Sequence, residues 1–313
     1  MEQMKTEQIH FLSADGRRTV TGWIYAQATK PVGVVQICHG MCEYIGRYER
    51  FINDMVQQGF VVCGHDHIGH GASSDPTEYG YFGPKDGYRN LVQDLHTMTL
   101  EVKKVYPDLP FFLFGHSMGS FVSRLYLSEF SDELSGVIIC GTGGPNPMSS
   151  LGIPVCRLVA KTKGEMYRSK LLDQLAFGSF NKKFTPQRTD KDWLTRDNAI
   201  VDRYLQDSKC MFLFTASGYG DLSKLSQKAN SSSWYQSLDR KLPMFLISGD
   251  MDPVGAYGSG VKKVYEKLKQ TGISDVSMKL YPEARHELLN ETNYDEVFGD
   301  ILRWVTAHIE KTK

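Results

Sequence analysis

A serine between two glycines is the residue in this chain most suited to nucleophilic chemistry. Residues 115–119 read Gly-His-Ser-Met-Gly, between the apolar run Phe111–Phe114 and the amphipathic stretch Met118–Glu129. A tight turn from strand to helix holds a serine hydroxyl above the edge of a sheet, and flanking glycines leave room for the turn. The free N–H groups of the following helix then point at the reacting carbonyl. We therefore expect Ser117 to be the nucleophile of an acyl transfer.

A serine hydroxyl attacks only when a base takes its proton and a third group orients that base. In folds that use this turn, the acid and then the histidine follow the serine along the chain. Of the nine histidines, His286 and His308 follow Ser117 with acidic residues in between. His308 lies in an expected C-terminal amphipathic helix, whereas His286 lies in a loop after the apolar run Val276–Tyr281. The order of residues therefore predicts His286 as the base.

Two aspartates follow the apolar run Met244–Ser248, in the sequence Gly-Asp-Met-Asp-Pro of residues 249–253. Asp252 precedes a proline, which favours an extended backbone that directs its carboxylate across the sheet edge. Asp250 suits a loop or a helix N-cap. Spacing alone leaves both aspartates as candidates for the acid.

Backbone N–H groups near Ser117 are needed to stabilise the negative oxygen of a tetrahedral intermediate. The N–H of Met118 is one candidate donor. The N–H of Met41 is a second, because the loop after the apolar run Val32–Cys38 begins His-Gly-Met and Gly40 lets the backbone approach closely. A His-Gly pair after a strand is also a common turn, so this second assignment depends on the first.

Short apolar runs alternate with helical stretches over most of the chain, which is typical of an α/β protein with a mostly parallel sheet and helices on both faces. The strands expected from these runs are Gln8–Leu12, Thr19–Tyr25, Val32–Cys38, Phe60–Cys63, Phe111–Phe114, Val137–Cys140, Met244–Ser248 and Val276–Tyr281. The expected helices are Tyr48–Gln58, Tyr88–Val105, Met118–Glu129, Tyr257–Gln270 and Tyr294–Ile309. The alternation stops from residue 145 to about residue 240. We therefore predict a core of residues 1–144 and 241–313, with residues 145–240 inserted as a helical cap.

Charge and composition limit the class of protein. Lys and Arg together number 36, as do Asp and Glu, so the chain lacks the positive excess of a nucleic-acid-binding protein. Hydrophobic residues make up 41% of the chain, which is enough for a packed core. No apolar run reaches the roughly 18 residues that span a bilayer, and the first residues lack an apolar signal segment. The six cysteines contain no Cys-x-x-Cys pair. These features predict a cytoplasmic globular protein without a nucleic-acid partner, cofactor or disulfide framework.

The motifs together resemble the α/β-hydrolase superfamily and, within it, the monoacylglycerol lipase and lysophospholipase-like group of serine aminopeptidase S33 type. The matching pieces are His39-Gly40-Met41-Cys42-Glu43 with Gly46-Arg47-Tyr48, Asp66 with Gly69-His70-Gly71-Ala72-Ser73, Gly115–Gly119, Gly249 with Asp252, and Ala284-Arg285-His286-Glu287. The resemblance implies a triad of Ser117, Asp252 and His286, which favours the second of the two aspartates. It also implies oxyanion donors at Met41 and Met118, and a cap over an acyl pocket.

The sequence departs from the family pattern at two positions. Cys42 stands where the loop His-Gly-x-Gly-Glu has its second glycine, so with Gly40 it is expected to border the substrate site. A thiol would then lie near the pocket, and we expect bulky thiol reagents to inhibit through Cys42. His67 stands where the family often has arginine, and nothing in the sequence explains it.

Three closely spaced histidines offer a different class of site. His65, His67 and His70 have the spacing of the metal-binding HxHxDH motif of metallo-β-lactamase-type enzymes, although Gly69 stands where that motif has its aspartate. Imidazoles suit zinc, but no downstream ligand set follows. The sequence therefore favours the serine triad, with a zinc-dependent hydrolase and a non-enzymatic receptor of the same fold as alternatives.

The expected substrate class depends on the resemblance and on the composition of the cap. We expect a serine carboxylic-ester hydrolase for monoacylglycerols, lysophospholipids or related acyl esters, with an S33-type aminopeptidase or amidase as the alternative. The apolar clusters 171–177 and 211–214 are expected either to line an acyl tunnel or to form the cap's own core. Residues 145–200 hold ten Lys and Arg against five Asp and Glu, which suits transient contact with an anionic membrane surface or a lysophospholipid headgroup, although such a run is more often a solvated face. No protein partner is implied.

Overall fold

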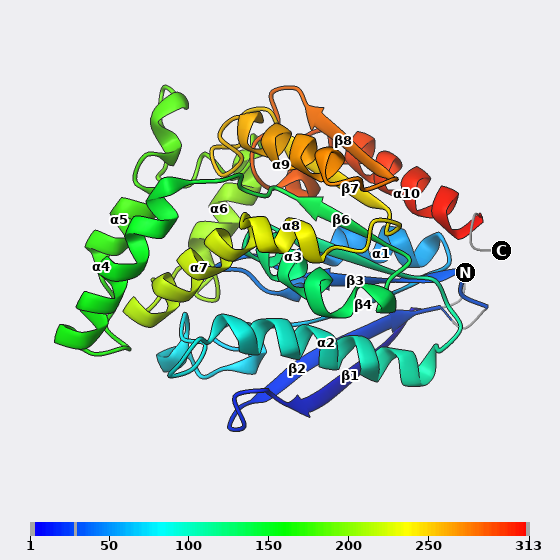
Figure 1. Cartoon of the computed structure of the whole chain (residues 1–313), viewed down its shortest axis with the longest axis horizontal. Helices are drawn as coiled ribbons and strands as arrows, with labels where there is room; N and C mark the ends of the chain where they lie inside the picture. The colour runs from blue at the N-terminus through cyan, green and yellow to red at the C-terminus, as the bar shows by residue number, and fades with distance from the viewer. Residues whose placement is uncertain (1–3, 28–29, 311–313) are drawn as a thin grey trace.

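The computed structural model describes residues 4–27 and 30–310, and its central element is an eight-stranded sheet (Figure 1). The strands are β1 (Lys5–Leu12), β2 (Thr19–Ala26), β3 (Gly33–Cys38), β4 (Phe60–His65), β5 (Phe111–His116), β6 (Gly136–Cys140), β7 (Met244–Gly249) and β8 (Val276–Tyr281). Their order across the sheet is β1-β2-β4-β3-β5-β6-β7-β8. Strands β3 to β8 run parallel, and β1 and β2 form an antiparallel edge next to β4. The mostly parallel sheet expected from the sequence is confirmed.

Helices cover both faces of the sheet (Figure 1). Helices α1 (Glu49–Gln57) and α10 (Tyr294–Glu310) pack on one face, and α2 (Tyr88–Val105), α3 (Met118–Phe130) and α9 (Ser259–Gln270) pack on the other. No helix among the described residues is long and apolar enough to cross a bilayer. The expectation that the first residues lack a signal segment falls partly on residues 1–3, which lie outside the described part of the chain.

The central strand β5 shows why apolar runs in this sequence become strands. All of its residues are buried, and successive side chains enter opposite faces of the sheet. Phe112 and Phe114 join the core under α1 and α10, whereas Leu113 joins the core under α2 and α3. A strand with helices on both faces must be apolar throughout, which is the pattern that the sequence displays.

Two strands continue past the end of their apolar runs into histidines. β4 ends at His65 and β5 ends at His116, each two residues beyond the expected end. His65 pairs with Gly22 of β2, and His116 pairs with Cys140 of β6. Backbone pairing therefore extends these strands even where the side chain is polar.

The residues between β6 and β7 form the helical segment that interrupts the alternation. It contains α4 (Pro147–Lys163), α5 (Lys170–Phe177), α6 (Asn198–Gln206), α7 (Ala216–Ala229) and α8 (Ser232–Ser237). No strand forms among the described residues 145–240, apart from one isolated bridge between Arg168 and Thr215. Helix α7 packs on both α4 and the core helix α3, while α4 and α5 form the outer end of the molecule (Figure 1). Residues 145–240 are called the inserted segment below.

Candidate active site

Ser117 lies at the turn between β5 and α3, with a backbone conformation that residues other than glycine rarely adopt. Its φ is 54° and its ψ is −121°. The two flanking glycines are sterically required, because a Cβ at Gly115 would overlap Ser123 and a Cβ at Gly119 would overlap the carbonyl oxygen of Cys38. The turn leaves Ser117 partly exposed between buried neighbours. The local sequence therefore presents one hydroxyl at the carboxyl edge of the sheet, as predicted.

His286 links Ser117 to Asp252. Its Nε2 lies 2.8 Å from the Ser117 hydroxyl oxygen, and its Nδ1 lies 3.0 Å from Oδ2 of Asp252. Since a carboxylate only accepts, Nδ1 carries the proton and Nε2 is free to accept from the serine. His286 is 2% exposed and Asp252 is fully buried. Three residues that follow β5, β7 and β8 thus form one hydrogen-bonded chain.

The two candidate aspartates have different partners. Asp252 faces His286 and also accepts a hydrogen bond from the N–H of Val254 at 2.8 Å. Asp250 accepts from the N–H of Glu283 at 2.7 Å, so it holds a turn. The structure brings Asp252 to the site and gives Asp250 the loop role considered for it.

A glycine that the sequence analysis did not single out makes room for the imidazole. Gly141 follows β6 with a φ of 58°, and a Cβ there would lie 3.2 Å from Cε1 of His286. Strand β6 separates β5 from β7 in the sheet, so the imidazole must cross its end to reach Ser117. The signal that could have found this residue is a glycine immediately after a buried strand.

The loop after β3 approaches Ser117 closely at Gly40, as expected. A Cβ at Gly40 would lie 3.0 Å from the Cβ of Ser117. Met118 is the first residue of α3, whose first N–H groups have no partner within the helix. Met41 follows Gly40 in the same loop and is partly buried. Their N–H groups remain our predicted oxyanion donors.

Glu43 and His116 connect the loop after β3 to His286. The Glu43 carboxylate accepts from the N–H of Gly40, from the Tyr48 hydroxyl at 2.9 Å and from Nδ1 of His116 at 3.0 Å. Nε2 of His116 lies 3.3 Å from the carbonyl oxygen of His286. Both nitrogens of His116 therefore face acceptors, and only the imidazolium can donate to both. Both residues lie in the family motifs, but the sequence alone indicates no role for either.

Their pKa values agree with a buried ion pair. Burial by itself raises the pKa of Glu43, but the charges of His116 and Arg47 and the N–H of Gly40 outweigh it and lower that pKa to about 2. Burial lowers the pKa of His116, but the neighbouring Glu43 raises it above its ordinary value. Arg47 in turn donates two hydrogen bonds, at 2.6 and 2.7 Å, to Glu287.

The thiol of Cys42 is buried, which argues against the expectation that bulky reagents reach it. Its side chain is 6% exposed, and the S–H donates to the carbonyl oxygen of Phe212 at 3.3 Å. Burial raises the pKa of the thiol. A buried, protonated thiol is a poor nucleophile. The sequence indicated the position of Cys42 in the loop but not the direction of its side chain.

The closely spaced histidines form a buried cluster with His39. The N–H of His67 donates to Nε2 of His39 at 2.9 Å, and the N–H of Cys42 donates to Nε2 of His70 at 3.2 Å. Burial lowers the pKa of His67 to about 4 and that of His70 to about 3. Burial also lowers the pKa of His65. Within the described chain, no group of three His, Cys, Asp or Glu side chains is arranged to hold a metal ion. The arrangement of these histidines therefore gives no support to the zinc-dependent alternative.

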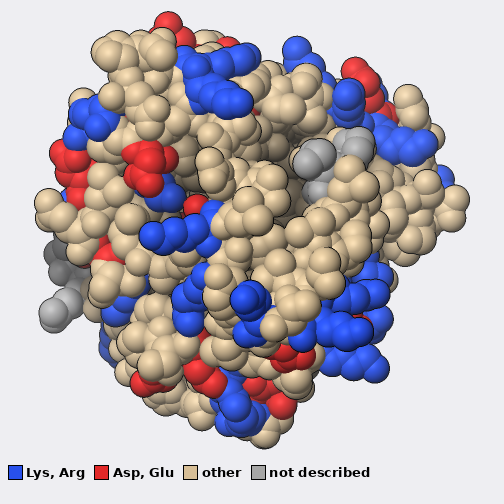
Figure 2. Space-filling view, turned by 90° about the vertical axis from the view of Figure 1, so that its left-hand side faces the viewer, with Lys and Arg blue, Asp and Glu red and all other residues tan. Residues whose placement is uncertain are grey.

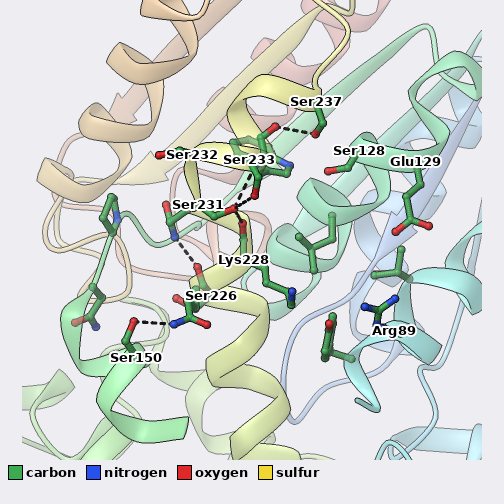
Figure 3. Close-up of a pocket in the computed structure, with 18 of the residues that line it drawn as sticks. Arg89, Ser128, Glu129, Ser150, Ser226, Lys228, Ser231, Ser232, Ser233 and Ser237 are labelled. Carbon is green, nitrogen blue, oxygen red and sulfur yellow. Dashed lines mark hydrogen bonds between the residues drawn. The ribbon is translucent and has the colours of Figure 1, made fainter. Parts of the chain in front are cut away.

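A large open hollow lies apart from this chain of residues (Figure 3). Its volume is about 1030 Å³, and it lies between α2 and α3 on one side and α7 and α8 on the other. Serines dominate its lining, including Ser231, Ser232 and Ser233 at the start of α8. Neither Ser117 nor His286 lines it, so this hollow is separate from the candidate reaction site.

The chain is similar over most of its length to known lipases and esterases. The family described as "Serine aminopeptidase, S33" matches residues 29–293. The monoacylglycerol lipase of Mycolicibacterium smegmatis is 25% identical, over 97% of this chain and 99% of its own length. The human monoglyceride lipase is 28% identical, over 95% of this chain and 89% of its own length. Among solved structures, a thermostable carboxyl esterase from Bacillus coagulans in complex with glycerol is 33% identical, with a TM-score of 0.92 over 98% of this chain and 100% of that one.

Proposed function

Because the chain belongs to the α/β-hydrolase family described as serine aminopeptidase, S33, and is a serine ester hydrolase of that class, we propose that it cleaves monoacylglycerols, lysophospholipids or related acyl esters. The observation that carries the proposal is the hydrogen-bonded chain Ser117–His286–Asp252. Lipases and esterases among the relatives favour ester substrates over the peptides that the family description names. The same triad can serve amides, so the amide reaction is an outcome of the test below.

The proposed reaction proceeds in two acyl transfers. His286 takes the proton of Ser117 as the oxygen attacks the ester carbonyl, and then gives it to the leaving alcohol. Asp252 holds the Nδ1 proton and stabilises the imidazolium that forms. Water then enters and repeats the sequence on the acyl-enzyme. The N–H groups of Met41 and Met118 donate to the oxyanion in both steps.

The buried pair of Glu43 and His116 supports this reaction by holding the groups that carry it out. Glu43 accepts from the N–H of Gly40, which holds the loop that carries Met41. His116 donates to the carbonyl oxygen of His286. One ion pair therefore fixes both the oxyanion loop and the backbone of the base. A fixed set of donors stabilises developing charge without reorganising, which is the largest source of catalysis in many enzymes.

The inserted segment is proposed as the cap, residues 145–240, over the acyl site. Its apolar clusters divide between two roles: Leu172 and Phe214 are buried in a core that joins the segment to the sheet, whereas Leu171, Leu175 and Met211 are exposed. The exposed leucines cannot line a closed tunnel in this arrangement. They instead belong to an outward-facing surface.

That surface suits transient contact with a lipid surface. Leu151 and Leu158 of α4 and Leu171 and Leu175 of α5 are each more than half exposed. Figure 2 shows this end of the molecule, where Lys and Arg side chains border uncharged areas. The neighbouring cations include Lys161, Lys163 and Lys170. Exposed apolar groups with basic neighbours bind anionic lipid through burial and charge together.

Vesicle binding tests this contact. The double variant Leu158→Ser with Leu171→Ser should bind phosphatidylglycerol vesicles at least tenfold more weakly than the unaltered protein. Leu12→Ser, which changes an equally exposed leucine on β1, is the matched control and should bind normally. Equal binding by all three proteins would overturn the membrane contact.

Two measurements test the reaction itself. A fluorophosphonate probe should label the protein, and Ser117→Ala should abolish both labelling and hydrolysis. Rates on p-nitrophenyl esters of increasing chain length, a monoacylglycerol, a lysophospholipid and a proline p-nitroanilide then define the substrate class. The proposal expects the acyl esters to exceed the anilide in kcat/KM. An anilide rate above every ester rate would replace it with an aminopeptidase or amidase function.

A further inference from the structure

Five residues of the inserted segment, Asp192–Arg196, lie alongside the loop that carries His286. Backbone hydrogen bonds join the two: the N–H of His286 donates to the carbonyl oxygen of Trp193 at 3.4 Å, and the N–H of Glu287 donates to that of Leu194 at 2.7 Å. The base therefore receives backbone support from a segment that lies outside the sheet and its covering helices. We call residues 192–196 the strap.

Side chains strengthen this connection. The Arg285 guanidinium donates to the carbonyl oxygen of Asp192 and, at 3.1 Å, to that of Thr195. The Thr195 hydroxyl donates to the carbonyl oxygen of Asn290 at 2.8 Å. Each of these bonds crosses between the strap and the histidine loop. Both the residue before His286 and a residue four positions after it are thereby tied to the strap.

A buried carboxylate closes the far end of the strap. Glu291 is 3% exposed and accepts from Nε of Arg196 at 2.8 Å and from the backbone N–H of Arg285 at 2.8 Å. The same carboxylate therefore binds the strap and the histidine loop together. Hydrogen bonds to a buried charged group are stronger than neutral ones, so this end of the inserted segment is held firmly.

The indole of Trp193 contacts the imidazole itself. Their ring centroids lie 5.0 Å apart with an interplanar angle of 41°. The backbone N–H of Trp193 donates to Oδ1 of Asn181 at 2.8 Å, which fixes the position of the Trp193 backbone. His116 contacts the same imidazole, with centroids 4.8 Å apart. The ring of His286 is thus bounded by one aromatic side chain of the inserted segment and one of the core.

We propose that the strap positions His286 for proton transfer, and that Trp193 is the positioning residue that limits rotation of its imidazole. This inference rests on the proposed function, because it gives a purpose to the strap only if His286 is the base. The imidazole must keep one nitrogen within hydrogen-bond reach of Ser117 and the other on Asp252. A misplacement of about 1 Å at such a site costs on the order of a hundredfold in rate.

The strap also predicts which part of the inserted segment is fixed. Residues 192–196 cannot move away without breaking the backbone bonds of His286 and Glu287. Any opening of the segment that keeps the enzyme active must therefore leave residues 192–196 in place.

Substitution of Trp193 tests the proposal through kinetics. Trp193→Leu should lower kcat about 10- to 100-fold on a short p-nitrophenyl ester, with KM changed less than threefold, because a loosened base slows the chemical step. Trp193→Phe, which keeps a ring against the imidazole, should recover most of that loss. Trp304→Leu is the matched control, since Trp304 is likewise partly buried but its described ring contacts are with Phe112, Phe245 and His308. It should retain kcat within threefold.

A second measurement does not depend on activity. In the unaltered protein, the backbone amides of His286 and Glu287 should exchange slowly with deuterium, and the Nδ1 proton between His286 and Asp252 should give a low-field NMR resonance. Trp193→Leu should speed the exchange at least tenfold and broaden the resonance. Trp304→Leu should change neither, and a shift of Tm alone does not count as support.

Three results would overturn the strap. One is a rise in KM with kcat unchanged in Trp193→Leu, which would make Trp193 part of the substrate wall only. Another is an equal loss of kcat in Trp304→Leu, which would indicate a general disturbance of packing. The third is unaltered exchange at His286 and Glu287 in Trp193→Leu. Failure of the fluorophosphonate to label Ser117 in the unaltered protein would instead reject the proposed function, while the exchange measurement would still decide whether the strap holds the loop.

Discussion

Two groups of histidines lie at the carboxyl ends of strands in this protein, and they differ in what their ring nitrogens contact. His286 follows β8 and is bonded to the side chains of Ser117 and Asp252. In the other group, which follows β3 and β4, Nε2 of His39 and Nε2 of His70 each accept a backbone N–H. Both groups are buried. Burial and proximity therefore do not distinguish a catalytic histidine from a structural one.

What distinguishes them is a carboxylate partner. In the cluster, burial lowers the pKa of His67 and His70, so these rings stay neutral: Nε2 of His70 accepts the N–H of Cys42, and Nε2 of His67 faces the carbonyl oxygen of His39. At the site, Asp252 faces His286, and Glu43 raises the pKa of His116. The active-site loop depends on both kinds of histidine, because Gly40 binds Glu43 and Cys42 binds His70. The cluster is thus a support for the loop rather than a second site.

The largest expected effect separates the two aspartates near His286. Asp252→Asn should lower kcat about 10⁴-fold, because the amide no longer holds the Nδ1 proton or stabilises the imidazolium. Asp250→Asn removes a turn contact and should retain kcat within about threefold. Turnover of a p-nitrophenyl ester by both purified variants provides the measurement. Equal losses would show that the carboxylate partner is not what sets His286 apart.

Substitution of Glu43 tests the ion pair that joins the two regions. Glu43→Gln leaves His116 buried beside an uncharged partner and weakens the bond to Gly40. We expect the free energy of unfolding to fall by about 3–5 kcal/mol, as for other buried pairs that lose one partner. We also expect kcat to fall by roughly a hundredfold, since an oxyanion donor is displaced. Urea unfolding and ester kinetics measure the two effects.

The difference in unfolding free energy between the unaltered protein and Glu43→Gln should depend on pH in a definite direction. The pKa of Glu43 is lowered to about 2, so its contribution to stability is fully present above its ordinary value of 4.5 and is lost as pH falls toward 2. The pKa of His116 is raised above 6.5, so its contribution is fully present below pH 6.5 and is lost as pH rises through the raised value. The unfolding free energies of the unaltered protein and Glu43→Gln should therefore differ most between about pH 4.5 and 6.5. A difference independent of pH would mean that Glu43 is uncharged in the folded protein.

A smaller effect is expected within the histidine cluster. His70→Phe leaves the N–H of Cys42 without its acceptor and should destabilise the protein by about 1–3 kcal/mol. Neither ring nitrogen of His65 has a hydrogen-bond partner among the described residues, so His65→Phe should change stability by less than about 1 kcal/mol. Urea unfolding of both variants at neutral pH gives the comparison. The reverse ranking would contradict the supporting role assigned to His70.

The core and the reactive residues could be predicted from the sequence because both leave local signals. A strand buried on both faces, such as β5, must be a continuous apolar run, and α2 forms with the bounds expected for it. Ser117 follows from its turn, and His286 follows from its order in the chain. The choice of Asp252 over Asp250 needed the family resemblance, since spacing does not reveal which carboxylate reaches the imidazole.

The remaining features depend on contacts between distant residues or on side-chain direction. Glu43 and His116 lie 73 positions apart, and nothing in either motif indicates that they meet. The strap lies in the segment without a regular pattern, so no periodicity in the sequence indicates that it pairs with the histidine loop. Cys42 was placed in the correct loop, but the thiol turns toward Phe212 and is buried. Local sequence predicts elements and motifs, whereas partners across the fold require the structure.

The smallest expected effect concerns metal removal. Because no group of three His, Cys, Asp or Glu side chains in the described part of the chain is arranged to hold a metal ion, and Nε2 of His70 already accepts the N–H of Cys42, a metal ion would have to rearrange the cluster before it could bind. Dialysis against a chelator should therefore change kcat by less than twofold, and elemental analysis should find far less than one zinc per chain. A protein with one zinc per chain that loses activity on chelation and regains it on zinc addition would reverse the comparison. The buried histidines would then be the reaction centre, and His286 would need another explanation for its position on Ser117.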